Sequence, residues 1–277
     1  MSDILRLKGP ILVLGGGGFI GSNLLAMLRT ERDDVLDGEG QGRTIFNLIG
    51  YGGHPNQTDP DTIYRTNFMM TQKLVHSAEG CAAYIHAGSS SEYGVNAAGP
   101  SEDQAPTPNS DYAASKAACA SLLYYMGKHR QFPCAHLRLY SVYGPGEGPD
   151  RLIPTVIREG RKGRFPPLVH PAISRDFVYI DDVCRAFIHT AAHLQPWDYG
   201  EAFNIGTGVK TTIGDVALMA QMTFGITAPA RFGTMTERVW DVREWYANPE
   251  KAYRLMGWKA TTSFTEGFYL TAAAQGD

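Results

Sequence analysis

The sequence of 277 residues predicts an α/β fold, in which a doubly wound parallel sheet is followed by a smaller C-terminal lobe. Short apolar runs alternate with segments of helical spacing, which is typical of a parallel sheet covered by helices. The first apolar run leads directly into a glycine-rich turn. After Gly146 the alternation becomes irregular. We therefore expect a first domain over residues 1–145 and a substrate-binding lobe over 146–277, interleaved with the sheet.

The first half of the chain carries the regular alternation. Continuous apolar runs that end in glycine or polar residues indicate strands buried on both faces. Such strands are expected at 11–14, 34–37, 45–50, 82–87 and 134–140. Helical spacing predicts the intervening helices at 22–30, 61–78 and 111–130.

The second half predicts a mixed set of elements. Helices are expected at 152–159, from 181 to 190, and at 211–224. Short strands are expected at 177–180 and 203–205, and a proline-rich loop at 165–171. Part of this lobe should therefore return to the sheet.

The bulk composition excludes several function classes. A net charge of −3 gives no electrostatic basis for binding nucleic acid or a membrane surface. No apolar stretch approaches the length of a membrane span, and the N-terminus lacks a signal-peptide pattern. The unpaired spacing of the cysteines predicts buried thiols of a cytoplasmic protein, and neither a disulfide framework nor a metal site. These cysteines are Cys81, Cys119, Cys134 and Cys184.

The glycine-rich turn has the spacing Gly15-x-x-Gly18-x-x-Gly21, with Phe19 and Ile20 inside it. It follows a predicted strand and opens a predicted helix, the context that a dinucleotide-binding turn requires. Gly15 allows the tight turn, Gly18 lets the backbone approach a pyrophosphate, and Gly21 lets the helix pack closely. The turn therefore predicts a Rossmann-like sheet that holds a dinucleotide.

Tyr112 and Lys116 stand four residues apart in a predicted helix, so a phenol and an ammonium share one face. The nearby ammonium favours the phenolate, which lets the tyrosine exchange protons near neutral pH. The serines 89–91 end a strand at the carboxyl edge of the sheet, where sites of open α/β folds lie. One of their hydroxyls could bind the reacting oxygen, while at least one other is expected to face solvent.

Several ordered segments resemble the extended short-chain dehydrogenase/reductase family, in its nucleotide-sugar epimerase/dehydratase branch. The resemblance covers nearly the whole chain. It is carried by segments 13–23, 64–67, 89–94, 112–116, 137–145, 175–182, 203–206 and 246–249.

The resemblance implies roles for individual residues. The implied catalytic residues are Ser89, Tyr112 and Lys116, with Asn67 as a support position. The implied cofactor contacts are Gly15, Gly18, Phe19, Ile20, Gly21, Asp37, Gly50, Tyr112, Lys116 and Val142. The implied contacts with the substrate, a nucleoside-diphosphate sugar, are Ser90, Ser141, Leu152, Arg175, Arg238 and Asp241.

The chain departs from the family pattern between Gly21 and Ile45. Only residues 22–44 intervene, enough for a helix and one short strand but too few for a whole βαβ unit. The sheet is therefore expected to be truncated near this edge, where adenine and its ribose normally bind. Asp37 is the best candidate for the ribose carboxylate, with Glu39 close behind, and a solvated acidic loop is an equal alternative.

A second departure concerns the reaction. Dehydratases of this family have an acidic residue two positions before the tyrosine that ends the serine segment, and Ser91 stands at that position. Glu92 comes one residue later and is expected to point the other way. This argues against a 4,6-dehydratase, which stays an alternative, and favours an epimerase or a keto-sugar reductase.

The sequence thus predicts an enzyme that uses NAD, with NADP not excluded, on a nucleoside-diphosphate sugar, with hydride transfer at C4. The alternative is a nucleotide-sugar-binding protein that has lost efficient cofactor use. The resemblance also implies a homodimer through a four-helix bundle, formed by the helix of Tyr112 and the helix before the serine strand. Apolar residues available for this contact are Leu122, Leu123, Tyr124 and Met126.

Overall fold

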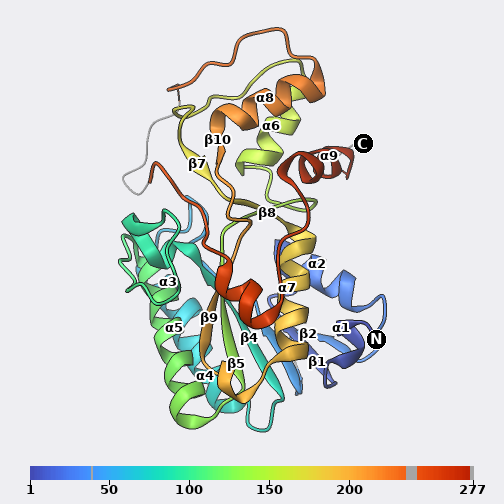
Figure 1. The fold of residues 1–277 in the computed structure, drawn as a ribbon, viewed down its shortest axis with the longest axis vertical. Coiled ribbons are helices and arrows are strands. Elements are labelled where there is room, and N and C mark those ends of the chain that lie inside the picture. The colour runs from blue at the N-terminus through green and yellow to red at the C-terminus, as the bar shows by residue number, and fades with distance from the viewer. Residues whose placement is uncertain (39, 235–241, 275–277) are drawn as a thin grey trace.

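A computed structural model describes residues 1–38, 40–234 and 242–274, and shows a six-stranded parallel sheet (Figure 1). The strand order is β2-β1-β3-β4-β5-β9. These strands are β1 (Ile11–Leu14), β2 (Val35–Asp37), β3 (Thr44–Asn47), β4 (Ala83–Ser89), β5 (Cys134–Leu139) and β9 (Glu201–Ile205). The predicted α/β fold with a doubly wound parallel sheet is confirmed.

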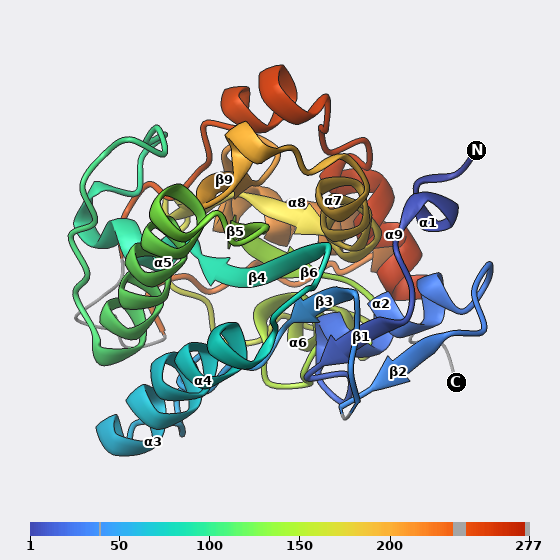
Figure 2. The same cartoon turned by 90° about the horizontal axis from the view of Figure 1, so that it is seen from below.

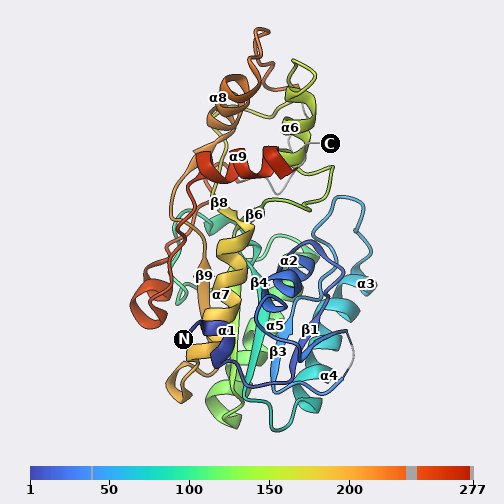
Figure 3. The ribbon, with the colours of Figure 1, turned by 90° about the vertical axis from the view of Figure 1, so that its right-hand side faces the viewer.

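Helices cover both faces of this sheet, as Figures 2 and 3 show. On one face lie α2 (Phe19–Leu28) and α7 (Ile180–His193), with α1 (Asp3–Arg6) packed against α7. On the other lie α3 (Pro60–Tyr64), the π-helical turn η1 (Arg65–Met69), α4 (Met70–Ser77) and α5 (Asp111–Arg130). Alternate β1 residues pack into opposite cores, Ile11 and Val13 into one and Leu12 and Leu14 into the other. This explains why the strand is a continuous apolar run.

The sheet ends early beside β2, as the short interval in the sequence predicts. β2 pairs with β1 in parallel, from Ile11 opposite Val35 to Val13 opposite Asp37. The next strand along the chain, β3, lies on the other side of β1. Among the described residues no strand lies outside β2. The usual third strand of the first half is therefore absent from this sheet.

The C-terminal part builds a lobe above the sheet and also contributes to the sheet (Figure 1). Its helices are α6 (Leu152–Gly160), α8 (Ile213–Phe224) and α9 (Phe264–Ala274). Two small sheets join it, one of β6 (Ser141–Tyr143) with β8 (Phe177–Tyr179) and one of β7 (Ser174–Arg175) with β10 (Thr211–Thr212). Short helical turns are η2 (Ser90–Asn96), η3 (Pro196–Asp198) and η4 (Ala252–Met256). α7 and β9 return to the sheet.

Some predicted boundaries were wrong for local reasons. α2 begins at Phe19 and not at residue 22, because Gly18 is its N-cap and the glycine turn already forms its first turn. The helix predicted over 61–78 is present but contains the π-helical turn η1. β4 extends to Ser89, so this serine belongs to the strand itself.

The four cysteines are free and buried, as predicted. Burial raises the pKa of Cys81 and Cys119 to about 11, so these thiols are protonated at neutral pH. None of the helices over 1–38, 40–234 and 242–274 has the length and hydropathy needed to cross a bilayer.

Candidate functional site

A cavity of about 820 Å³ opens where the sheet strands end at their carboxyl edge. It is bounded by the glycine turn, the end of β4, the start of α5 and the segment after β5. Thirteen of the predicted site residues line it, namely Gly15, Gly18, Phe19, Ile20, Gly21, Gly50, Ser89, Ser90, Tyr112, Lys116, Ser141, Val142 and Arg175. One cavity therefore brings together most residues that the sequence predicts for cofactor, catalysis and substrate.

The glycine turn has the geometry of a backbone cradle. Gly15 has φ +83°, which favours glycine, and its carbonyl accepts a hydrogen bond from the Gly18 N–H at 3.1 Å. A Cβ at Gly21 would lie 2.1 Å from the same carbonyl oxygen, so only glycine lets α2 start here. Gly18, Phe19 and Ile20 line the cavity, and the free N–H groups of a helix's first turn favour an anionic ligand.

Asp37 lies at the flank of this turn. A Cβ on Gly16 would stand 2.1 Å from its Oδ1, so the absence of a side chain at Gly16 admits the carboxylate. Asp37 is exposed at the end of β2 and does not line the cavity. The end of the second strand is where ribose carboxylates stand in dinucleotide-binding folds. Its place beside the turn suits the predicted ribose contact.

Lys116 is held deep beside the cavity. Its side chain is 3% exposed, and Nζ donates to the Ala87 carbonyl at 2.9 Å and the Ile49 carbonyl at 3.5 Å. Tyr112, one turn earlier on α5, is half-buried and lines the cavity. α5 begins where Ser110 accepts a hydrogen bond from the Ala113 N–H, which fixes the first turn that carries Tyr112.

Asn67 supports this region from η1. Its side chain is fully buried, and Nδ2 donates to the Tyr51 carbonyl at 2.9 Å and to Ser115 Oγ at 2.8 Å. Its Oδ1 accepts from the Tyr51 N–H at 2.8 Å. Asn67 therefore joins the loop after β3 to the α5 turn between Tyr112 and Lys116.

Ser89 ends β4 with its hydroxyl at the cavity. Its Oγ donates to Ser91 Oγ at 3.0 Å and accepts from the Ser91 N–H at 3.1 Å. Its own N–H donates to Glu92 Oε1 at 2.9 Å. These bonds fix the serine at the start of η2, so its hydroxyl has a defined direction.

Arg175 and Trp245 form the lobe side of the cavity. The Arg175 guanidinium lies 5.4 Å from the centre of the Trp245 ring, and Nη1 donates to the Ser174 and Val242 carbonyls. Trp245 Nε1 donates to Ser90 Oγ at 2.9 Å, which ties the lobe to the end of β4. Ser141 is placed nearby through its N–H, which donates to the Asp176 carbonyl.

Glu92 points away from the cavity into a buried ionic cluster. It is fully buried, with Oε1 2.8 Å from His136 Nε2 and Oε2 accepting from Arg138 Nε at 2.8 Å. Burial alone would raise the pKa of Glu92, but His136, Arg138 and the Ser89 N–H lower it to about 2. The carboxylate is ionised and fully engaged, and the expectation that it turns away from the site agrees with this geometry.

Four predicted site residues are not placed in the cavity. Asp37 stands at the flank of the glycine turn, outside the cavity lining. Leu152 packs partly buried against the core and does not line it, although the preceding Arg151 does. Arg238 and Asp241 lie outside the described residues, as does Glu39.

Sequence reasoning missed Trp245, Tyr140 and Glu147, which also line the cavity. They lie at strand ends or in loops without a periodic pattern. The only signals were the position of Trp245 just before the 246–249 segment and that of Glu147 just after 137–145.

Glu147 is a buried carboxyl whose two oxygens have different surroundings. Its side chain is 7% exposed, and Oε1 lies 3.6 Å from Arg151 Nε. Oε2 is buried and has no hydrogen-bond partner in the part of the chain that the structure describes. Burial raises the pKa of Glu147 to about 8, against the opposing effect of Arg151. The carboxyl is therefore protonated at neutral pH and can donate a hydrogen bond at the cavity wall.

Replacing Glu147 with Gln is expected to flatten the pH dependence of stability. Between the unfolded pKa of 4.5 and about 8, the native carboxyl keeps a proton that the unfolded chain releases. Wild-type stability therefore falls as pH rises through this window, by up to about 1.4 kcal/mol per pH unit, and E147Q lacks this loss. Melting temperatures measured from pH 5 to pH 8 should diverge in favour of E147Q. Parallel curves for wild type, E147Q and the exposed control E250Q would contradict this.

Comparisons with known proteins show which family of proteins this chain resembles. The model of the NAD dependent epimerase/dehydratase family matches residues 29–206. The UDP-glucose 4-epimerase of Mycolicibacterium smegmatis is 28% identical over 308 residues, covering 94% of this chain and 96% of that protein. The low-salt glycan biosynthesis protein Agl12 of Haloferax volcanii is 28% identical over 243 residues, covering 72% of this chain and 77% of that protein.

A solved structure shows the same architecture. MoeE5 in complex with UDP-glucose and NAD is 29% identical, covers 96% of this chain and 98% of that chain, and has a TM-score of 0.84. The similarity thus extends over almost the entire length of both chains.

Proposed function

This chain belongs to the NAD dependent epimerase/dehydratase family, and we propose that it epimerises or reduces a nucleoside-diphosphate sugar at C4. The observation that carries the proposal is the single cavity lined by the glycine turn, by Ser89, Tyr112 and Lys116, and by Arg175. MoeE5, which has the same fold, was solved with UDP-glucose and NAD bound.

The residues present fit a dinucleotide. The N–H groups at the start of α2 would hold its pyrophosphate, and Asp37 its adenosine ribose. Lys116, adjacent to Gly50, would hold the nicotinamide ribose. When bound, the nicotinamide supplies hydride transfer to or from the sugar. NAD is the proposed cofactor, since a carboxylate such as that of Asp37 can accept hydrogen bonds from free ribose hydroxyls. NADP is the other dinucleotide to test.

The side chains would divide the remaining work. Tyr112 would take or return the proton of the sugar hydroxyl, and Ser89 would hydrogen-bond the same oxygen. Arg175 would bind the diphosphate, since a guanidinium fork suits phosphate oxygens, with Ser90, Ser141 and the backbone near Leu152 as further contacts. Arg238 and Asp241 would act at the far end of the nucleotide. The segment 146–277 would form the substrate lobe.

The geometry of Glu92 favours an epimerase or reductase over a dehydratase. A dehydratase of this family needs an acid at the position of Ser91, and Glu92 is fully buried and paired away from the cavity. The position that carries the acid for water elimination in dehydratases therefore has no carboxyl group in this chain.

The truncated sheet supports a second candidate, a nucleotide-sugar-binding protein with weakened cofactor use. The first test denatures freshly purified protein and identifies released nucleotides by mass spectrometry. Calorimetric titrations with NAD, NADP and a panel of nucleotide sugars follow. Co-purified or micromolar NAD(P) supports the enzyme. Nucleotide-sugar binding without any dinucleotide binding supports the second candidate.

We also propose a homodimer through α5 and the α3–η1–α4 helix. The expectation for two contact residues was wrong, because Leu123 and Met126 are buried in the chain's own core. Tyr124 is 55% exposed, and Tyr125, Met69 and Met70 are 42–47% exposed on the same helices. Light scattering after size exclusion should give twice the 30.3 kDa of one chain. A monomer mass at micromolar concentration would contradict the dimer.

A further inference from the structure

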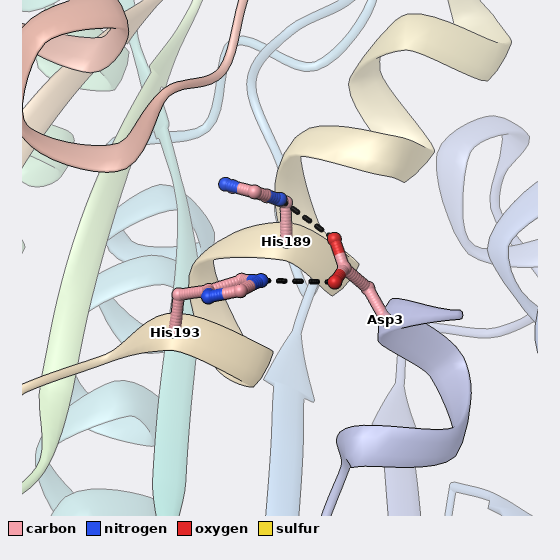
Figure 4. Close-up of side chains that lie close together, drawn as sticks. All are labelled: Asp3, His189 and His193. Carbon is pink, nitrogen blue, oxygen red and sulfur yellow. Dashed lines mark hydrogen bonds and ion pairs between the residues drawn. The ribbon is translucent and has the colours of Figure 1, made fainter. Parts of the chain in front are cut away.

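Asp3, His189 and His193 form a cluster where α1 meets α7 (Figure 4), and none of the three lines the cavity. Asp3 comes from α1, and the two histidines are one turn apart on α7. Asp3 Oδ2 lies 2.6 Å from His189 Nδ1, and Oδ1 lies 2.9 Å from His193 Nε2. All three candidate ligand atoms lie within 4.8 Å of one another.

The hydrogen bonds of His189 indicate which of its ring nitrogens faces the carboxylate of Asp3. Its Nε2 contacts the Met256 carbonyl, which can only accept, so Nε2 carries a proton. In the neutral imidazole, Nδ1 then presents a lone pair to a carboxylate oxygen 2.6 Å away. Two acceptors at this distance repel each other unless a positive charge lies between them. A metal ion that supplies this charge, bound at ~2.0–2.2 Å from each atom, would move the two atoms apart to roughly 3.3 Å.

The donor set suits a metal ion. Two imidazole nitrogens and one carboxylate are ligands that zinc and other first-row divalent ions take in proteins. The Met256 carbonyl fixes the ring of His189, as outer hydrogen bonds do at metal sites. The side chains are 31%, 23% and 35% exposed for Asp3, His189 and His193, which leaves access for an ion and for water as further ligands. Arg6 Nε lies 4.0 Å from Asp3 Oδ1 and is a competing cation.

We propose that Asp3, His189 and His193 bind a divalent transition-metal ion such as Zn²⁺, which fastens α1 to α7. The site is separate from the proposed reaction, since none of the three lines the cavity. α1 has only four residues and cannot be stable alone, so its position depends on contacts with α7. A metal ion that binds only the folded chain would stabilise this junction.

The test uses the full chain without a histidine tag, stripped with EDTA and titrated with ZnCl₂ near neutral pH by calorimetry. We expect one Zn²⁺ per chain, and a melting temperature raised by about 5 °C or more at roughly 100 times Kd. The buried, protonated cysteines do not compete, because thiols must ionise to bind zinc.

Three variants locate the site. H193Q and D3N should each weaken Zn²⁺ binding at least about 10-fold, whereas H76Q, which changes an exposed histidine on α4, should bind like wild type. D3N is nearly isosteric, so it tests the ligand even if H193Q fails to fold. Absence of Zn²⁺ binding by wild type would overturn the proposal and leave the cluster as a hydrogen-bonded contact between α1 and α7. Wild-type affinity in both H193Q and D3N would also overturn it.

Discussion

Replacing Tyr112 with Phe is expected to lower nucleotide-sugar turnover by about 10²–10⁴-fold, the usual contribution of a positioned acid/base group. Tyr112 lines the same cavity as the glycine turn and Ser89, and Phe keeps the aromatic ring. Only the hydroxyl that exchanges the substrate proton is removed. Affinity for NAD and for the nucleotide sugar should therefore change little, because most of the binding surface stays intact.

The measurement is turnover of a panel of nucleotide sugars by wild type and Y112F, with calorimetric titration of both ligands. Y64F is the matched control. The Tyr64 hydroxyl donates a hydrogen bond to Asp111 Oδ1 at 3.2 Å near the start of α5, but Tyr64 does not line the cavity. Removing this hydroxyl should therefore leave turnover unchanged. Turnover in Y112F within a few-fold of wild type would show that another group moves the proton.

Replacing Arg138 with Met is expected to destabilise the fold by about 3–5 kcal/mol, the cost of leaving a buried charge unpaired. Arg138 is 5% exposed and donates to Glu92 Oε2 at 2.8 Å, to the Tyr93 hydroxyl at 2.7 Å and to the Glu102 carbonyl at 3.0 Å. Met fills part of the volume of the arginine side chain, but the Glu92 carboxylate then keeps only His136 and the Ser89 N–H as partners.

Urea unfolding at two pH values measures this effect. The native pKa of Glu92 is lowered below its unfolded 4.5, so its charged interactions stabilise the fold above that range and are lost as pH falls. R138M should therefore lose more stability at pH 7 than near pH 4, where protonation of Glu92 relieves the unpaired charge. The double variant E92Q/R138M should be less destabilised than the sum of the single variants.

The exposed Arg130 at the end of α5 provides the control, since R130M should change stability by no more than about 0.5 kcal/mol. Equal losses in R138M and R130M would show that the buried cluster contributes no more than a surface charge. Since Glu92 also holds the Ser89 N–H, a lower turnover in R138M than in R130M is expected as well.

Local patterns in the sequence were sufficient to predict the framework of the site. The apolar run 11–14 and the glycines after it predict β1 and the turn because both depend on neighbouring residues only. The helix of Tyr112 and Lys116 was predicted with its observed bounds, since Ser110 caps one end and the polar 128–130 segment closes the other. Parallel strands then bring their carboxyl ends to one edge, which places these segments around one cavity.

Interactions between distant parts of the chain could not be predicted in this way. Trp245 contacts Ser90, which is 155 residues away in the sequence, and Asp3 contacts His189, which is 186 residues away. Neither contact produces a periodic pattern in the sequence. Leu123 and Met126 were assigned to a dimer contact because apolar residues on a helix look alike whether they face the core or a partner. Only the packing of α5 on the sheet decides which side is buried.

The short β2 strand also bears on aggregation. A sheet edge with free N–H and C=O groups can add a strand from another molecule. At one edge, β2 offers only three residues and ends in the charged, exposed Asp37. At the other edge, Asn204 Nδ2 donates to the Asn248 carbonyl and Lys251 pairs with Glu201 at 2.6 Å, so the segment around η4 packs beside β9. Both edges are therefore poorly suited to pair with a strand of another molecule. This disfavours aggregation through the sheet at high protein concentration.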